Sequence, residues 1–169
     1  MDTRTPPATG KPYRVAAHGW GAHRTIGAAL RAAPDGAVIS IAPGSYSESL
    51  VLERDVTIVA ESTEGLVELT GAHGPALTAQ GGTATLRGLV LRGTDPAGIA
   101  VSVRDATLVL EDCHVRGGRL DLAGWANATL TRCRVHDCAG AGVHATGDAR
   151  LSLSRCTVGD VDGSGIILT

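Results

Sequence analysis

The chain has 169 residues, of which 43% are hydrophobic and 2% aromatic, with 23 glycines and no phenylalanine. It is long enough for one domain and too apolar to be a disordered polar segment. Fifteen basic and seventeen acidic residues give a net charge of −2, so we expect no large basic surface and no nucleic-acid partner. No apolar run approaches the roughly 18 residues of a membrane span, and the N-terminus lacks the apolar segment of a signal peptide. We therefore expect a cytoplasmic protein with reduced cysteines and no membrane contact.

The first 36 residues are predicted to form an arm and a cap. Residues 1–23 read as an N-terminal arm with a strand, in which Trp20 packs against the cap, and a ligand site at His18 and His23 is the alternative. Residues 24–36 are predicted as a short capping helix with Ile26, Leu30 and Ala33 on one face, ended by Pro34-Asp35-Gly36.

Residues 37–169 are predicted as the coils of a β-solenoid. The first strands are expected at 38–42, 49–52 and 56–60, with turns at 43–46 and 53–55 between them. From about residue 76, similar segments recur every 21 or 22 residues. Each segment contains three triplets in which inward and outward side chains alternate, as in a strand, and no helix. A leucine-rich repeat would need a different leucine spacing, and a propeller blade would need about 40 residues. The repeat therefore predicts an all-β fold, a parallel β-helix of about six coils.

Stacked coils place equivalent residues in columns along the axis, and the alignment of the repeats predicts these columns. Three are expected to face inward: Leu89, Cys113, Cys133 and Cys156; Ala84, Ala106, Ala128 and Ala149; Leu86, Leu108, Leu130 and Leu151. One is expected to face outward: Thr78, Ala100, Asp121, His144 and Ile167.

The segment TIGAALRAAPDGAVISIAPGSYSESLVLERDVTIVAE resembles the N-terminal cap and first coil of right-handed parallel β-helix proteins of the pectate-lyase-like superfamily. The later Cys-x-Val and Gly-Val/Ile elements are similar to the generic repeats of that superfamily. The resemblance covers residues 24–169, agrees with the right-handed crossover rule, and specifies fold more than chemistry. It also implies an actinobacterial intracellular type, which sometimes precedes an AAA-type ATPase module. The chain contains no phosphate-binding GxxxxGK[ST] motif.

Pectin methylesterases share the Gly-x-Tyr-x-Glu element that stands here as Gly44-Ser45-Tyr46-Ser47-Glu48. Their downstream motifs, which supply catalytic carboxylates and an arginine, have no equivalent in this chain. We therefore expect Tyr46 to pack and Glu48 to cap a turn. The carboxylates needed to bind calcium in a pectate lyase are isolated here.

The weak catalytic candidates are Asp121 and His144, expected on neighbouring coils, with Ser102 or Thr146 as a third group. The alternative is an ordinary surface pair. Cys133, His136 and Cys138 have metal-ligand side chains, but stacked inward cysteines do not converge on one ion, so we expect no metal and no cofactor. Trp125, at a turn, either binds a sugar or partner protein or covers a gap.

Residues Ile166, Ile167 and Leu168 form the last predicted strand, and no C-terminal cap follows in the sequence. An open solenoid end exposes unpaired backbone and apolar core, so we expect a protein partner or self-association there, or continuation into a larger protein. The sequence thus predicts a non-catalytic scaffold or interaction module. The alternative function is a carbohydrate-active enzyme or polysaccharide-binding domain, and whether the chain is an enzyme stays open.

Overall fold

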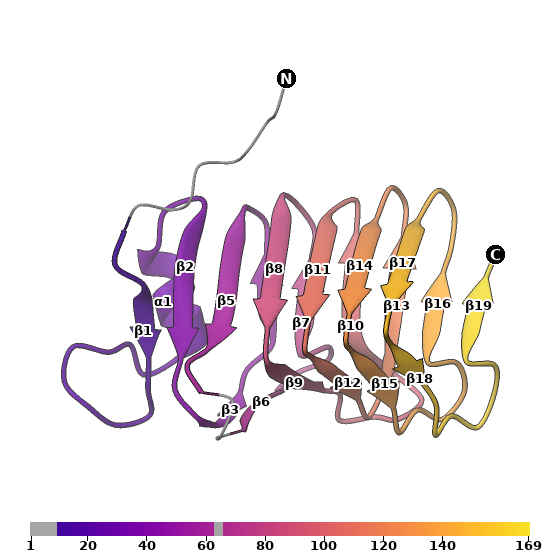
Figure 1. The fold of residues 1–169 in the computed structure, drawn as a ribbon, viewed down its shortest axis with the longest axis horizontal. Coiled ribbons are helices and arrows are strands. Elements are labelled where there is room, and N and C mark those ends of the chain that lie inside the picture. Colours follow the sequence, from indigo (N-terminus) through magenta and orange to yellow (C-terminus); the bar gives the residue numbers. More distant parts are fainter. Residues whose placement is uncertain (1–9, 63–65) are drawn as a thin grey trace.

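The computed structural model describes residues 10–62 and 66–169, so residues 1–9 of the predicted arm lie outside the described residues. The described part is a parallel β-helix with one short helix at its N-terminal end (Figure 1). Each coil runs through three parallel sheets, here named sheets A, B and C. No helix among the described residues is long and apolar enough to cross a membrane.

Sheet A has seven strands and sheets B and C have six each. Sheet A contains β1 (Tyr13–Val15), β2 (Ala37–Ile41), β5 (Val56–Ala60), β8 (Thr83–Arg87), β11 (Thr107–Glu111), β14 (Asn127–Thr131) and β17 (Arg150–Ser154). Sheet B contains β3 (Gly44–Ser47), β6 (Val67–Thr70), β9 (Leu89–Arg92), β12 (His114–Arg116), β15 (Arg134–His136) and β18 (Thr157–Val158). Sheet C contains β4 (Leu50–Leu52), β7 (Leu77–Ala79), β10 (Ile99–Arg104), β13 (Arg119–Ala123), β16 (Val143–Ala145) and β19 (Ile166–Leu168).

The predicted β-solenoid of about six coils is confirmed, and sheet A has a seventh strand because β1 pairs with β2. The strand β3 was missed, because its Gly44 and Ser45 follow a proline and look like turn residues. The turn predicted at 43–46 is therefore wrong. Alternating side chains face the core and the solvent along the longer strands, as in β2, which alternates buried and half-buried residues.

Two of the predicted inward columns are out of register by two residues in alternate coils. Leu108, and not Ala106, pairs with Ala84 and with Ala128, and Leu110 continues the column of Leu86 and Leu130. A shift of two residues keeps every side chain on its own face, so burial patterns could not reveal the error. The cysteine column is correctly placed, since Cys113 and Cys133 precede the paired residues His114 and Arg134.

Each of the last four turns from sheet A to sheet B contains one residue in the left-handed region. Gly88, Asp112, Arg132 and Arg155 occupy successive turns with φ of 74°, 52°, 52° and 54°. This conformation lets the chain change direction within one or two residues, and Asp and Gly adopt it readily. Arg132 donates from Nε and Nη2 to the two carboxylate oxygens of Asp112, at 2.7 and 2.8 Å, which joins two successive turns.

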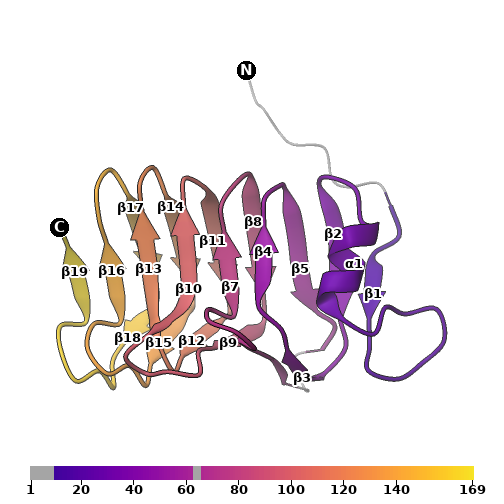
Figure 2. The ribbon, with the colours of Figure 1, turned by 180° about the vertical axis from the view of Figure 1, so that it is seen from behind.

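The helix α1 (Ile26–Ala32) covers the N-terminal end of the solenoid beside β1 and β2 (Figure 2). It begins after Thr25, whose hydroxyl accepts a hydrogen bond from the backbone N–H of Ala28 at 3.1 Å. Ile26 and Ala29 are buried in the core. The helix is shorter than the predicted segment 24–36, since Ala33 already has an extended conformation.

Candidate functional site

The outer face of sheet C carries one continuous column of side chains, one from each of its six strands. In register, the column consists of Val51, Thr78, Ser102, Asp121, His144 and Ile167. The prediction placed Ala100 where Ser102 stands, and this is wrong, because β10 is irregular between Ile99 and Val101 and Ala100 is fully buried. The corrected column places a hydroxyl on the strand next to Asp121.

Asp121 is the centre of a three-residue polar cluster on this face. Its Oδ1 lies 3.1 Å from Nδ1 of His144 and accepts a hydrogen bond from Nε of Arg119 at 3.0 Å. The side chains of Asp121, His144 and Arg119 are 20%, 29% and 32% exposed, so the cluster is partly shielded from water. A carboxylate that orients a histidine in this way is one half of an acid–base pair.

Neither hydroxyl considered as a third group, Ser102 or Thr146, is hydrogen-bonded to His144 among the described residues. Ser102 lies on the far side of Asp121, two strands from His144, which is roughly 9–10 Å across the sheet. The hydroxyl of Thr146 donates to the backbone carbonyl of Leu122 at 3.4 Å. The geometry therefore provides a carboxylate–histidine pair with a guanidinium partner, and not a nucleophile–base arrangement.

A pocket of about 270 Å³ adjoins the cluster. Arg119 and His144 form its polar side, Ile167 its apolar side, and the loops at 96–98 and 139–141 complete it. The pocket has room for one sugar ring or a short side chain.

The cysteine side chains face the interior, as the stacked column predicts. The Sγ atoms of Cys113, Cys133 and Cys156 each lie 3.2–3.5 Å from backbone carbonyl oxygens of their own and the preceding coil. A hydrogen bond with Cys133 and burial raise the pKa of Cys113, and burial raises the pKa of Cys138. Cys138, expected at a turn, is also buried, with its Sγ 3.3 Å from the Gly118 carbonyl oxygen.

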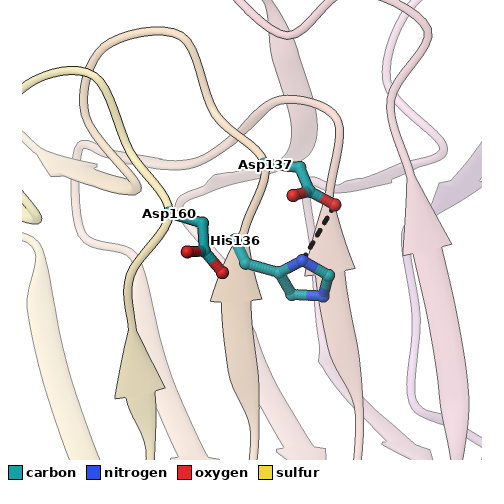
Figure 3. A group of neighbouring side chains, drawn as sticks. All are labelled: His136, Asp137 and Asp160. Carbon is teal, nitrogen blue, oxygen red and sulfur yellow. Dashed lines mark hydrogen bonds and ion pairs between the residues drawn. The ribbon is translucent and has the colours of Figure 1, made fainter.

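Metal-ligand side chains do meet at one turn, between sheets B and C. Atoms of His136, Asp137 and Asp160 lie within 4.8 Å of one another (Figure 3). His136 was among the predicted metal-ligand side chains, but Asp160 was not, because it lies 23 positions after Asp137, one coil further along the chain. Each carboxylate already has a partner, because Asp137 Oδ2 lies 2.9 Å from His136 Nδ1 and Asp160 accepts from Arg134 at 3.0 Å. The cluster is therefore held together by contacts within the protein.

The Gly-x-Tyr-x-Glu element has a structural role. The Tyr46 hydroxyl donates to the carbonyl of Ala42 at 2.8 Å, and its ring is buried. The two oxygens of Glu48 accept hydrogen bonds from the backbone N–H groups of Ile26 and Gly27 at 2.8 and 2.9 Å. Glu48 therefore caps the helix α1, where a turn had been predicted.

Both tryptophans are on the surface. Trp20 is fully exposed on a loop between β1 and α1, so the prediction that it packs against the cap is wrong. The flanking Gly19 and Gly21 both have positive φ, a conformation that glycine adopts readily. Trp125 is 74% exposed at the turn after β13, and its backbone N–H donates to Asp105 at 2.8 Å.

The C-terminal coil exposes residues whose counterparts in earlier coils are buried. Leu153, Ile166 and Leu168 are 37%, 40% and 70% exposed, whereas Leu130, Val143 and Ala145 in the same columns are 0–4% exposed. Ile167 lies instead in the outward column beside His144. Figure 1 shows β17, β18 and β19 at this end, opposite α1.

Comparisons with solved structures find a similar fold in pectin methylesterases. A mutant pectin methylesterase in complex with hexasaccharide IV superposes with a TM-score of 0.65 at 19% identity, over 85% of this chain and 56% of that one. PemA from Erwinia chrysanthemi gives 0.61 at 18%, with the same coverage, and the Aspergillus niger enzyme gives 0.54 at 16%, over 93% of this chain and 76% of that one. This chain thus spans about 56% of the length of the first two enzymes.

These identities show a shared fold, and no curated protein matches the chain. The family model of the right-handed β-helix region matches residues 76–169, which is more than half of the chain. The repeated coils, the inward columns and this match agree, and the chain belongs to the right-handed β-helix family.

Proposed function

We propose that the protein is a non-catalytic β-helix module that assembles with a second copy of itself through its C-terminal coil. The observation that carries this proposal is the exposure of Leu153, Ile166 and Leu168, whose column neighbours in the preceding coil are buried. Contiguous apolar side chains beside edge strands favour association with another chain.

The arrangement of the edges supports a partner of the same fold. The strands β17, β18 and β19 are the terminal strands of sheets A, B and C, so three edges surround one slice of core. A single peptide strand could pair with one of these edges. Only the end of another β-helix offers three edge strands around one slice of core, and a second copy of this chain is such a partner.

The N-terminal end of a second copy does not suit this contact. Helix α1 packs on β1 and β2 there, and its buried residues Ile26 and Ala29 complete the core (Figure 2). We therefore infer a contact between two C-terminal coils, related by a twofold axis with antiparallel strands across it. Such an interface is self-complementary and closes at two copies.

Sedimentation velocity over a range of protein concentrations tests this proposal. The wild-type chain should shift from monomer to dimer as concentration rises, and Leu168→Asp should abolish the shift because it places a charge within the apolar contact. Val51→Asp is the matched control, since Val51 is 53% exposed on the outer face of sheet C, in the strand β4 far from the C-terminal edge.

A wild-type chain that stays monomeric at every concentration would contradict the proposal. Dimerisation that Leu168→Asp leaves intact while Val51→Asp abolishes it would place the interface on the outer face of sheet C instead.

A second candidate function is carbohydrate binding on sheet C. The observation in its favour is the Arg119–Asp121–His144 cluster beside a pocket of about 270 Å³. The fold shared with a pectin methylesterase that was solved with a hexasaccharide is consistent with it, although fold alone does not establish function.

Calorimetry with oligogalacturonate should then show binding that His144→Ala removes and His114→Ala, on sheet B, preserves. Release of unsaturated sugars would indicate lyase activity, and absence of binding would exclude this candidate.

A further inference from the structure

A second pocket with charged side chains lies beside the first, at the turn from sheet B to sheet C, and Pro96 lines both pockets. It measures about 420 Å³, and its polar lining consists of Thr70, Arg92, Thr94, Arg116 and Asp137. The register explains this grouping, because Thr70, Arg92 and Arg116 are paired residues on β6, β9 and β12. Asp137 follows β15, so it lies one coil beyond Arg116.

The two arginines of this pocket share a single carboxylate. Arg116 donates from Nη2 to Glu68 Oε2 at 2.7 Å, and Nη1 of Arg92 lies 3.6 Å from Glu68 Oε1. Each guanidinium has five N–H donors, and the Nε of Arg116 is buried with no hydrogen-bond partner among the described residues. One carboxylate therefore leaves this side of the pocket with an excess positive charge and unused donors.

The other charged group of the pocket is negative. Asp137 sits in the left-handed region at φ 57°, and its Oδ2 lies 2.9 Å from Nδ1 of His136 (Figure 3). Its side chain is 56% exposed, so a carboxylate oxygen remains accessible from solvent. Along the solenoid axis the pocket thus runs from two arginines to an aspartate, over two strand spacings or roughly 10 Å.

We propose that this pocket binds a free α-amino acid as its zwitterion. The ligand carboxylate pairs with Arg92 and Arg116, which present the forked donors that suit a carboxylate. The ligand ammonium pairs with Asp137, and the hydroxyls of Thr70 and Thr94 provide further hydrogen bonds. A dianion such as phosphate would meet Glu68 and Asp137 as repelling charges, and a neutral sugar would leave the excess charge of the arginines unused. A zwitterion matches both ends of the pocket.

Two-dimensional amide NMR, with each of the twenty L-α-amino acids added in turn, tests this proposal. At least one amino acid should give saturable shifts at Thr70, Thr94 and Gly117. Its N-acetyl and α-carboxamide derivatives, each lacking one charge, should bind at least about tenfold more weakly, as expected for loss of one charge pair.

Two substitutions locate the binding, and each has a matched control. Arg92→Gln and Asp137→Asn should each weaken binding at least about tenfold. Arg87→Gln should not, since Arg87 is equally exposed and pairs with Glu111 on sheet A. Asp112→Asn should not, since Asp112 is also 56% exposed and has a φ of 52°.

All four substitutions are at exposed side chains, so their amide spectra should keep the dispersion of the folded protein. Absence of saturable shifts with every amino acid, even in the millimolar range, would overturn the proposal. Equal binding of the N-acetyl or α-carboxamide derivative, or shifts confined to other parts of the solenoid, would also overturn it. None of these outcomes depends on the C-terminal contact, so this proposal and the proposed self-association can fail separately.

Discussion

Glu48 shows how one side chain links the cap to the solenoid. It lies just after β3, and its two oxygens accept the first backbone N–H groups of α1, at Ile26 and Gly27. Helix N-termini leave such N–H groups without partners, and a negative charge there also interacts favourably with the helix dipole. The sequence predicted a capping role for Glu48, but not its partner, because contacts over 21 or 22 positions depend on how the coils stack.

We predict that Glu48→Ala lowers the free energy of unfolding by about 2 kcal/mol, because two backbone N–H groups lose their acceptors. Urea unfolding followed by circular dichroism measures this change. Glu53→Ala is the control: Glu53 is exposed and accepts from Gln80 at 2.9 Å, so its loss should cost less than about 0.5 kcal/mol. Equal stability of the two variants would show that Glu48 does not hold the cap.

At the scale of the strand, the sequence predicts burial better than register. The alternation of β11 and β14 identifies their inward side chains, and the structure agrees. It does not decide whether Ala106 or Leu108 follows Ala84 in the column, since both choices keep the same face inward. Which residue pairs with Ala84 depends on the length of the loop before β11. The irregularity of β10 at Ile99 likewise places Ser102 in the column of Asp121. The Asp121–His144 pair could be predicted because the loops between those two coils contain no such irregularity.

Two leucines in the same column allow the stacking to be tested. Leu130 is fully buried between coils, so Leu130→Ala should cost about 2–5 kcal/mol of unfolding free energy. Leu153 pairs with it in the terminal coil and is 37% exposed, so Leu153→Ala should cost less than half as much in dilute solution. Chemical unfolding of both variants at two protein concentrations provides the comparison. The cost of Leu153→Ala should rise with concentration, and a constant cost would argue against burial by a second copy.

At the scale of the molecule, the solenoid has two dissimilar ends. At one end, α1 covers the core, and its buried Ile26 and Ala29 are part of that core (Figure 2). At the other, Leu153, Ile166 and Leu168 stay exposed on the edge strands β17 and β19. The sequence predicted the helix at the N-terminal end from the helical pattern of residues 24–33. It could not predict the charged pocket of sheet B, because Arg92, Arg116 and Asp137 are brought together only by stacking of separate coils.

The most direct test of the proposed assembly is amide hydrogen exchange in the terminal coil, measured in dilute and in concentrated solution. We predict that exchange in β17, β18 and β19 slows as concentration rises, because their edge N–H groups gain partners across the twofold contact, while exchange in β11 and β12 stays the same. Exchange in the terminal strands that does not change with concentration would contradict the account.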